Sequence, residues 1–137
     1  MMSELLIPKS IWQQMRRHVQ RCAPLEACGL LAGRDAQVVL SQGVRNDARS
    51  PKRYFMNPKG QLRAFDRFEE LGLDFLGIYH SHPGGPRRPS PSDIKQSFYA
   101  VVQVIWSIQD GKWKAKGFWI DSGQVSEVYL RIIPNSN

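Results

Sequence analysis

The chain has 137 residues, with 19 Lys plus Arg against 12 Asp plus Glu, so its formal charge is +7. This length suits one hydrophobic core, and we expect residues 1–137 to form a single domain. Hydrophobic residues make up 42% of the chain, which excludes a disordered basic tail. The positive charge indicates association with an acidic partner, such as nucleic acid, but it does not specify any chemistry.

Neither a membrane span nor a secretory signal is visible in the sequence. No apolar run approaches the roughly 18 residues that a membrane-spanning helix needs. The start of the chain, MMSELLIPKSIWQQ, lacks a basic stretch followed by an apolar stretch. We therefore expect a cytoplasmic protein with no membrane partner. Cys22 and Cys28 are too few for a disulfide framework and are expected to be free thiols.

The first predicted element is an amphipathic helix. Ile11, Met15, Val19 and Cys22 recur at helical spacing and form one apolar stripe. We expect this helix to run from about Ser10, as its N-cap, to Cys22.

Two strands are expected next, around residues 28–32 and 37–44, with a turn between them. A loop rich in Arg, Asn, Ser and Pro follows. Asn57-Pro58 then predicts a second helix, because Asn suits the N-cap and Pro suits the first helical position. This helix is expected to end near Gly72 and to point three apolar side chains inward: Leu62, Phe65 and Phe68.

The second half of the chain begins with an apolar strand, Phe75–His80, and a loop rich in Pro and Gly, Pro83–Pro89. A short helix is expected to start at Ser90-Pro91. Three strands are predicted to finish the chain, at residues 101–108, 112–120 and 124–133. This alternation of helices and strands predicts the α/β class.

Two histidines before the Pro/Gly-rich loop have the spacing of a metal site. Side chains alternate across a strand, so His80 and His82 point to one face and Ser81 to the other. Asp93 follows in the first turn of the next predicted helix. Two imidazoles and one carboxylate leave a fourth position for water, which is typical of a catalytic zinc site. The alternative is a pair of ordinary half-buried histidines beside the start of a helix. Ser90 and Asp93 are also residue types that favour a helix start, which would explain them without a metal.

A hydrolytic zinc site also needs a group that moves protons, and Glu26 is the candidate. It stands at the entrance to the apolar segment 27–33, where burial raises a carboxyl pKa toward that of a general base. The alternative is an exposed acid after Pro24. Cys28 is expected to be a packed core thiol rather than a nucleophile, and His18 a solvated helix side chain.

Together these residues resemble the JAMM (MPN+) metalloprotease family, and its standalone prokaryotic JAB-domain members in particular. The shared pattern starts with Glu26 in the run Pro-x-Glu-x-Cys-Gly-Leu-Leu-x-Gly. It continues with His-x-His-Pro at residues 80–83, and then with Ser90 and Asp93 at the spacing of the family.

The resemblance implies a fold and a role for each site residue. The implied fold is a single MPN/JAB domain of the cytidine-deaminase-like class, with a mixed central β-sheet flanked by helices. His80, His82 and Asp93 would bind Zn²⁺ as metal ligands. Glu26 would be the general base, and Ser90 would hydrogen-bond the oxyanion of the tetrahedral intermediate.

The resemblance also implies a substrate class. The family cleaves peptide or isopeptide bonds after the C-terminal Gly-Gly tail of ubiquitin or ubiquitin-like proteins. This chain has no room for the insertions of members that act on ubiquitin chains. The implied partner is therefore a ubiquitin-like sulfur-carrier protein with a Gly-Gly C-terminus, and nucleic acid is not expected.

Two alternatives stay open. RadC-like JAB proteins carry a similar histidine loop and are linked to DNA-related roles. A non-catalytic module that binds nucleic acid or an acidic protein would use segment 45–67, where seven basic side chains against Asp47 and Asp66 leave a local charge of +5. The seven are Arg45, Arg49, Lys52, Arg53, Lys59, Arg63 and Arg67. Arg87 and Arg88 add a basic rim at the zinc loop that would suit an acidic protein substrate.

Overall fold

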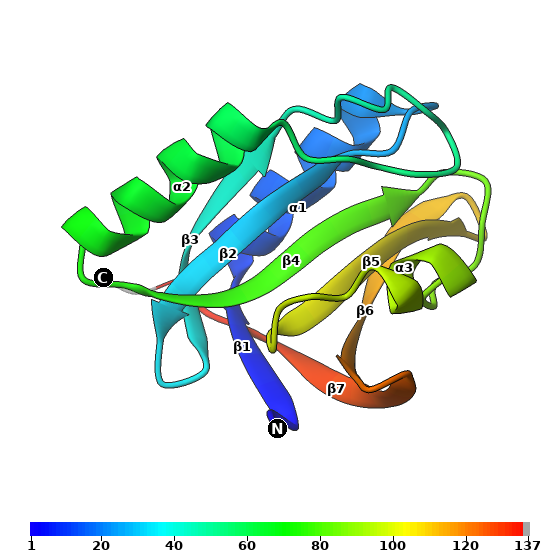
Figure 1. Ribbon diagram of the computed structural model, residues 1–137. Helices are drawn as coiled ribbons and strands as arrows, with labels where there is room; N and C mark the ends of the chain where they lie inside the picture. Colours follow the sequence, from blue (N-terminus) through cyan, green and yellow to red (C-terminus); the bar gives the residue numbers. More distant parts are fainter. Residues whose placement is uncertain (136–137) are drawn as a thin grey trace.

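Helices and strands alternate along the chain, as the α/β prediction requires. The computed structural model describes residues 1–135 (Figure 1). Over these residues the order is β1 (Glu4–Pro8), α1 (Lys9–Cys22), β2 (Cys28–Arg34), β3 (Gln37–Val44), α2 (Pro58–Glu70), β4 (Asp74–His82), α3 (Pro91–Lys95), β5 (Val102–Gln109), β6 (Lys112–Asp121) and β7 (Gln124–Ile133). None of the helices within residues 1–135 is both long and apolar enough to cross a membrane.

A mixed sheet forms the frame, with its strands in the order β1-β3-β2-β4-β5-β6-β7. β4 lies near the middle, antiparallel to β2 and parallel to β5. The sheet closes on itself because β1 pairs in parallel with β3 on one side and with β7 on the other. The expected mixed sheet with flanking helices is confirmed. β1 was not predicted, since five residues ending at a proline are too few to show a strand pattern.

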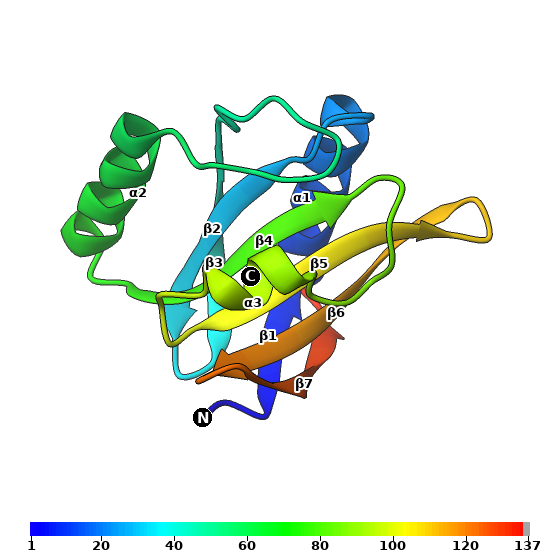
Figure 2. The ribbon, with the colours of Figure 1, turned by 45° about the vertical axis from the view of Figure 1, so that its right-hand side comes forward.

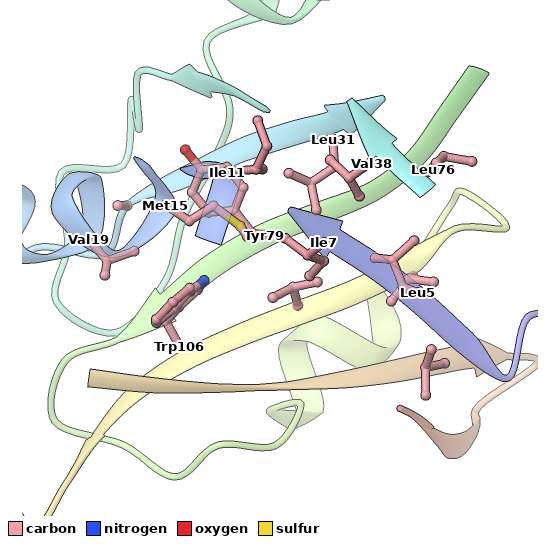
Figure 3. Packing of buried hydrophobic residues seen from close by; sticks show 14 residues of the cluster. Leu5, Ile7, Ile11, Met15, Val19, Leu31, Val38, Leu76, Tyr79 and Trp106 are labelled. Atoms are coloured by element: carbon pink, nitrogen blue, oxygen red, sulfur yellow. The ribbon is translucent and has the colours of Figure 1, made fainter. Parts of the chain in front are cut away.

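The larger core lies between α1 and one face of the sheet. Ile11, Met15 and Val19 are buried on one side of α1, which confirms the predicted stripe. Figure 3 shows these side chains directed toward Tyr79 and Trp106 on the sheet. This packing holds α1 against the back of β4 and β5.

The start of α1 differs from the prediction. The helix begins at Lys9, directly after β1, and Pro8 occupies the N-cap position without a side-chain cap. Ser10 is therefore not the N-cap but lies in the first turn, where its backbone N–H donates to Asn135 Oδ1 at 2.8 Å. The strand that precedes the helix determines where the chain turns, and this cannot be read from capping residue types.

The opposite face of the sheet is covered by α2. Asn57 caps this helix as predicted, and its side chain accepts from the Gly60 N–H at 2.9 Å. Ala64 and Phe68 are buried, whereas the prediction that Leu62 points inward is wrong because its side chain is 60% exposed. At 100° per residue, Leu62 lies on the far side of the helix from Ala64. Phe65 is half-buried.

The interpretation of His18 as a solvated side chain is also wrong. His18 is half-buried, and its Nδ1 lies 2.6 Å from the hydroxyl oxygen of Tyr79. Burial lowers the pKa of His18 and raises the pKa of Tyr79, so both are neutral near pH 7. A hydrogen bond between two neutral groups therefore ties α1 to β4.

The contrast between two apolar side chains tests this packing. We expect Met15→Ala to lower the free energy of unfolding by about 2–5 kcal/mol, because it leaves a cavity in the core. Leu62→Ala should change it by less than about 0.5 kcal/mol, because the side chain is already in water. Urea denaturation measures both values. Equal costs for the two variants would contradict the assignment of Leu62 to the surface.

Candidate active site

The two histidines predicted as metal ligands lie at the end of β4, on one face of the sheet. His80 and His82 are both buried, and their Nε2 atoms are 3.0 Å apart. Ser81 points to the opposite face, where its Oγ accepts from the Ala27 N–H at 2.8 Å. The strand alternation predicted for these three residues is confirmed. β4 extends to His82, two residues beyond the predicted end, so strand geometry rather than loop geometry holds both rings.

Asp93 reaches the histidines from the first turn of α3. The carboxylate oxygen Oδ2 lies 3.2 Å from Nε2 of His80 and 3.1 Å from Nε2 of His82. The same oxygen accepts from the Ser90 N–H at 2.8 Å, and the Ser90 hydroxyl accepts from the Asp93 N–H at 3.1 Å. These two reciprocal bonds form a capping box. Asp93 therefore caps α3 and lies against both histidines at the same time. Figure 2 shows α3 in front of β4 and β5.

Glu26 is the fourth predicted residue at this point. It precedes β2, its residue is only 3% exposed, and its carboxylate lies within 4.8 Å of the ring nitrogens of His80 and His82. Its backbone is held from both sides. The Glu26 N–H donates to Ser50 O at 2.8 Å, and Glu26 O accepts from Asn46 Nδ2 at 3.0 Å. The alternative of an exposed acid after Pro24 is thus wrong.

Burial sets the protonation of Glu26 and of the two imidazoles. It raises the pKa of Glu26 to about 7, which is the range of a general base at neutral pH. It also lowers the pKa of His80. Burial alone would lower the pKa of His82 as well, but the hydrogen bond to Asp93 and the bond to Pro86 raise it. The two rings thus differ because His80 is the more deeply buried, whereas at His82 the hydrogen bonds outweigh burial.

Asp93 stays ionised. Burial opposes this, but hydrogen bonds from His80, His82 and the Ser90 backbone hold its pKa well below the usual range. His82 Nδ1 lies 2.8 Å from the carbonyl oxygen of Pro86. A carbonyl only accepts, so Nδ1 carries a proton directed at Pro86, and this bond fixes the orientation of the His82 ring.

These donors fit a metal ion. Two imidazole nitrogens and one ionised carboxylate oxygen converge within 3.0–3.2 Å of one another. Glu26 Oε1 is buried beside them and has no hydrogen-bond partner within residues 1–135. An unpartnered buried oxygen is costly unless a further group occupies the site. The donor set is the kind that transition-metal ions prefer.

Two residues of the 45–57 loop complete the site and were not singled out in the sequence. The ring of Tyr54 packs on His80 with centroids 4.6 Å apart. Asn46 holds the loop together, because its Oδ1 accepts from the N–H groups of Ala48 and Phe55 while its Nδ2 binds Glu26. An irregular loop has no periodicity, so no sequence signal identified either residue.

A cleft of about 430 Å³ opens onto these groups. Its walls include Glu26, His82, Ser90, Lys52 and Arg88. Cys28 lies outside this cleft in the core, and burial raises the pKa of its thiol to about 12, so it is no nucleophile. The prediction of a packed core thiol is confirmed.

Comparisons with known proteins show the family to which this chain belongs. A model of the family described as prokaryotic homologs of the JAB domain matches residues 8–121. The chain is 39% identical to a probable TtuB-protein conjugate cleaving protease of Thermus thermophilus, over 94% of this chain and 83% of that protein. It is 32% identical to a desampylase of Pyrococcus furiosus, over 93% and 90% of the two chains. It is also 32% identical to a CysO-cysteine peptidase of Mycobacterium tuberculosis, over 94% and 91%.

Solved structures share the fold. A protein of Desulfitobacterium hafniense matches with a TM-score of 0.87 and 31% identity, over 96% of this chain and 94% of that one. A JAB1/MPN domain protein of Archaeoglobus fulgidus matches with a TM-score of 0.59 and 17% identity, over 93% and 99%. From the family match and the relatives named as proteases, the chain belongs to the prokaryotic JAB-domain family and is a hydrolase of the JAMM type.

Proposed function

We propose that this protein is a zinc-dependent peptidase that hydrolyses the bond after the C-terminal Gly-Gly tail of a ubiquitin-like sulfur-carrier protein. The convergence of His80, His82 and Asp93 beside the buried Glu26 carries the proposal. The relatives support the substrate class, because they are named for TtuB-conjugate cleavage, desampylation and CysO-cysteine cleavage.

His80, His82 and Asp93 would hold the zinc ion. Two neutral imidazoles and a carboxylate are a familiar donor set for catalytic zinc, with one position left open. The Pro86 carbonyl orients the His82 ring through Nδ1, and the capping box orients Asp93. A zinc ion bound here would lower the pKa of a water molecule and polarise the scissile carbonyl.

Glu26 is the general base in this proposal. Its carboxylate would accept a proton from the attacking water and later donate it to the departing amine. A pKa of about 7 lets the group do both near neutral pH. The two backbone hydrogen bonds of Glu26, to Ser50 and Asn46, hold the residue in place while the proton moves.

Ser90 can cap α3 and stabilise the reaction at the same time. Its oxygen accepts from the Asp93 N–H, which uses a lone pair and leaves the hydroxyl hydrogen free to donate. In our proposal that hydrogen binds the carbonyl oxygen as negative charge develops on it. Ser90 lines the cleft together with Glu26, so both groups face the same bound substrate.

The cleft suits a slender, extended tail. Its walls are formed largely by backbone and small or cyclic side chains of segment 83–86, which leaves room for glycine residues. Lys52 and Arg88 add positive charge, which favours a substrate with a carboxylate at the end of its tail or acidic groups around it. The neighbouring Arg87 is directed to Gln109 on β5, so it secures the loop rather than lining this cleft.

The basic side chains of segment 45–67 do not act as one unit. Arg45 and Arg49 line a separate cavity beside α1, Lys52 lines the cleft at the site, and Arg67 donates to Gln42 on β3. This division gives no support to the alternative in which segment 45–67 is a single nucleic-acid surface.

Metal binding gives the first test. Protein purified without chelator should contain about one equivalent of zinc, and Asp93→Asn should lose most of it because the ligand charge is gone. His18→Gln is the matched control, since it removes the remaining histidine, on the other face of the sheet, and should keep the metal. Elemental analysis by mass spectrometry reads out all three proteins. Less than about a tenth of an equivalent in the wild type, with no uptake on titration, would contradict the zinc proposal.

Cleavage of a carrier protein tests the function itself. The substrate is a small ubiquitin-like protein extended beyond Gly-Gly by cysteine or a short peptide, and intact-mass spectrometry locates the cut. Glu26→Gln should keep the zinc but slow cleavage by about 10²–10⁴-fold, because proton transfer is lost. Glu70→Gln, an exposed acid at the end of α2, should cleave normally. Glu26→Gln activity equal to wild type would show that the base is another group.

The two proposed roles of Ser90 can be tested separately, capping through the stability of the protein and oxyanion binding through the rate of cleavage. We expect Ser90→Gly to keep α3 capped within a few tenths of a kcal/mol. The same variant should lower kcat by about 10²–10³-fold, because the hydroxyl donor is missing. Ser90→Thr retains the hydroxyl and should restore most of the rate. Thermal unfolding and carrier cleavage measure the two effects, and a Ser90→Gly enzyme as fast as wild type would leave Ser90 as a cap only.

A further inference from the structure

A second, larger cavity lies on the other side of Glu26. Its volume is about 890 Å³, roughly twice that of the cleft at the metal donors. It is bounded by the C-terminal half of α1, by β3 and by the loop that follows β3. Figure 1 shows this loop passing beside the C-terminal end of α1. Apart from Glu26 in the shared wall, no residue with a metal-binding or catalytic role in the proposed peptidase lines this cavity.

Arginine side chains give the cavity a strong positive charge. Arg17, Arg21, Arg45 and Arg49 line it, and the acidic residue in its wall is the buried Glu26. Arg17 and Arg21 are one helical turn apart on α1, where like charges repel unless an anion lies between them. Within residues 1–135, Arg45 pairs with Asp47 at 3.0 Å, whereas Arg17, Arg21 and Arg49 have no acidic partner.

Neutral polar groups also line the cavity. The hydrogen-bonded pair of His18 and Tyr79 is part of its wall, and Gly43 packs directly against the imidazole. A Cβ at Gly43 would lie 2.8 Å from a ring carbon of His18, so a larger residue does not fit there. Ser41 and Gln14 add a hydroxyl and an amide to the wall.

The lining selects a class of ligand. Guanidinium groups present a planar fork of donors that matches phosphate oxygens, and the basic residues that line the cavity are all arginines. Each phosphate monoester carries about −1.5 to −2 charges at pH 7, so two of them match the positive charge that Arg17, Arg21 and Arg49 leave without an acidic partner. The volume is that of a small-molecule pocket. We propose that this cavity binds a small organic anion that bears two phosphate groups.

The same loop links this cavity to the candidate active site. Arg45 and Arg49 flank Asn46, whose side chain binds the Glu26 carbonyl, and Ser50 accepts from the Glu26 N–H. An anion that bridges α1 and the loop would therefore restrain the backbone of Glu26. This consequence concerns the general base of the proposed peptidase, but the binding itself does not depend on that function.

Calorimetric titration at constant ionic strength tests the site, with fructose 1,6-bisphosphate and ADP as probes. We expect saturable one-to-one binding to the wild type, and the tighter probe tells a sugar bisphosphate site from a nucleotide site. Arg17→Gln with Arg21→Gln should weaken binding at least about tenfold, because charged hydrogen bonds are lost. Arg63→Gln with Arg67→Gln is the matched control. It removes the same charge at the same helical spacing on α2, and should change binding less than about twofold.

Several outcomes would overturn the proposal. No saturable binding of either probe, or equal losses in the two double variants, would mean that only general surface charge is present. Asp93→Asn should bind the probes as tightly as wild type, and a loss there would place the anion at the metal donors instead. Asp93→Asn is also the variant expected to lose zinc. Anion binding by this variant therefore tests the second cavity independently of the peptidase proposal.

A measurement on the wild type needs no variant. Saturating bisphosphate should slow amide hydrogen exchange at Glu26 and over residues 45–50, since the ligand would fix the loop. Unchanged exchange in this segment would contradict the binding mode. A single-stranded oligonucleotide that binds more tightly than both probes, and is weakened equally by the two double variants, would also overturn the small-anion site.

Discussion

The register of β4 against β2 is the constraint on which the site depends. Ser81 N–H donates to Ala27 O at 3.0 Å, and Ala27 N–H donates to Ser81 Oγ at 2.8 Å. These bonds lock the residue after Glu26 to the residue between the two histidines. A shift by one residue would turn His80 and His82 toward α1 and move Glu26 away from them. The backbone pairing of two buried strands thus fixes which polar groups meet.

The capping box of α3 carries the second half of this arrangement. A capping carboxylate ordinarily satisfies a backbone N–H and nothing else. Here the Asp93 carboxylate also lies against both imidazoles, and hydrogen bonds from the two rings and from the Ser90 N–H hold it ionised in a partly buried place. A very short helix can therefore position a functional group accurately, because the cap that starts the helix and the group it presents are one side chain.

Sequence reasoning failed where a neighbour in space overrides local pattern. Ser10 has a capping residue type, but β1 runs directly into α1 and moves the helix start to Lys9. Leu62 is apolar, yet α2 rests on the sheet through Ala64 and Phe68 and leaves Leu62 in water. His18 lies among arginines in the sequence, and only the approach of Tyr79 from β4 makes it half-buried. The helix start depends on strand β1, which pairs with β3 and β7, and the other two errors come from contacts between residues far apart in the chain.

The sequence by itself determined the alternation of helices and strands, the common face of His80 and His82, and the capping pair of Ser90 and Asp93. These follow from periodicities and caps that act over a few residues. Only the tertiary structure decided that Glu26 is buried beside the histidines, that the sheet closes through β1, and that four arginines share one cavity. Burial, closure and clustered charge arise from strand pairing and packing over long sequence separations, which local patterns do not encode.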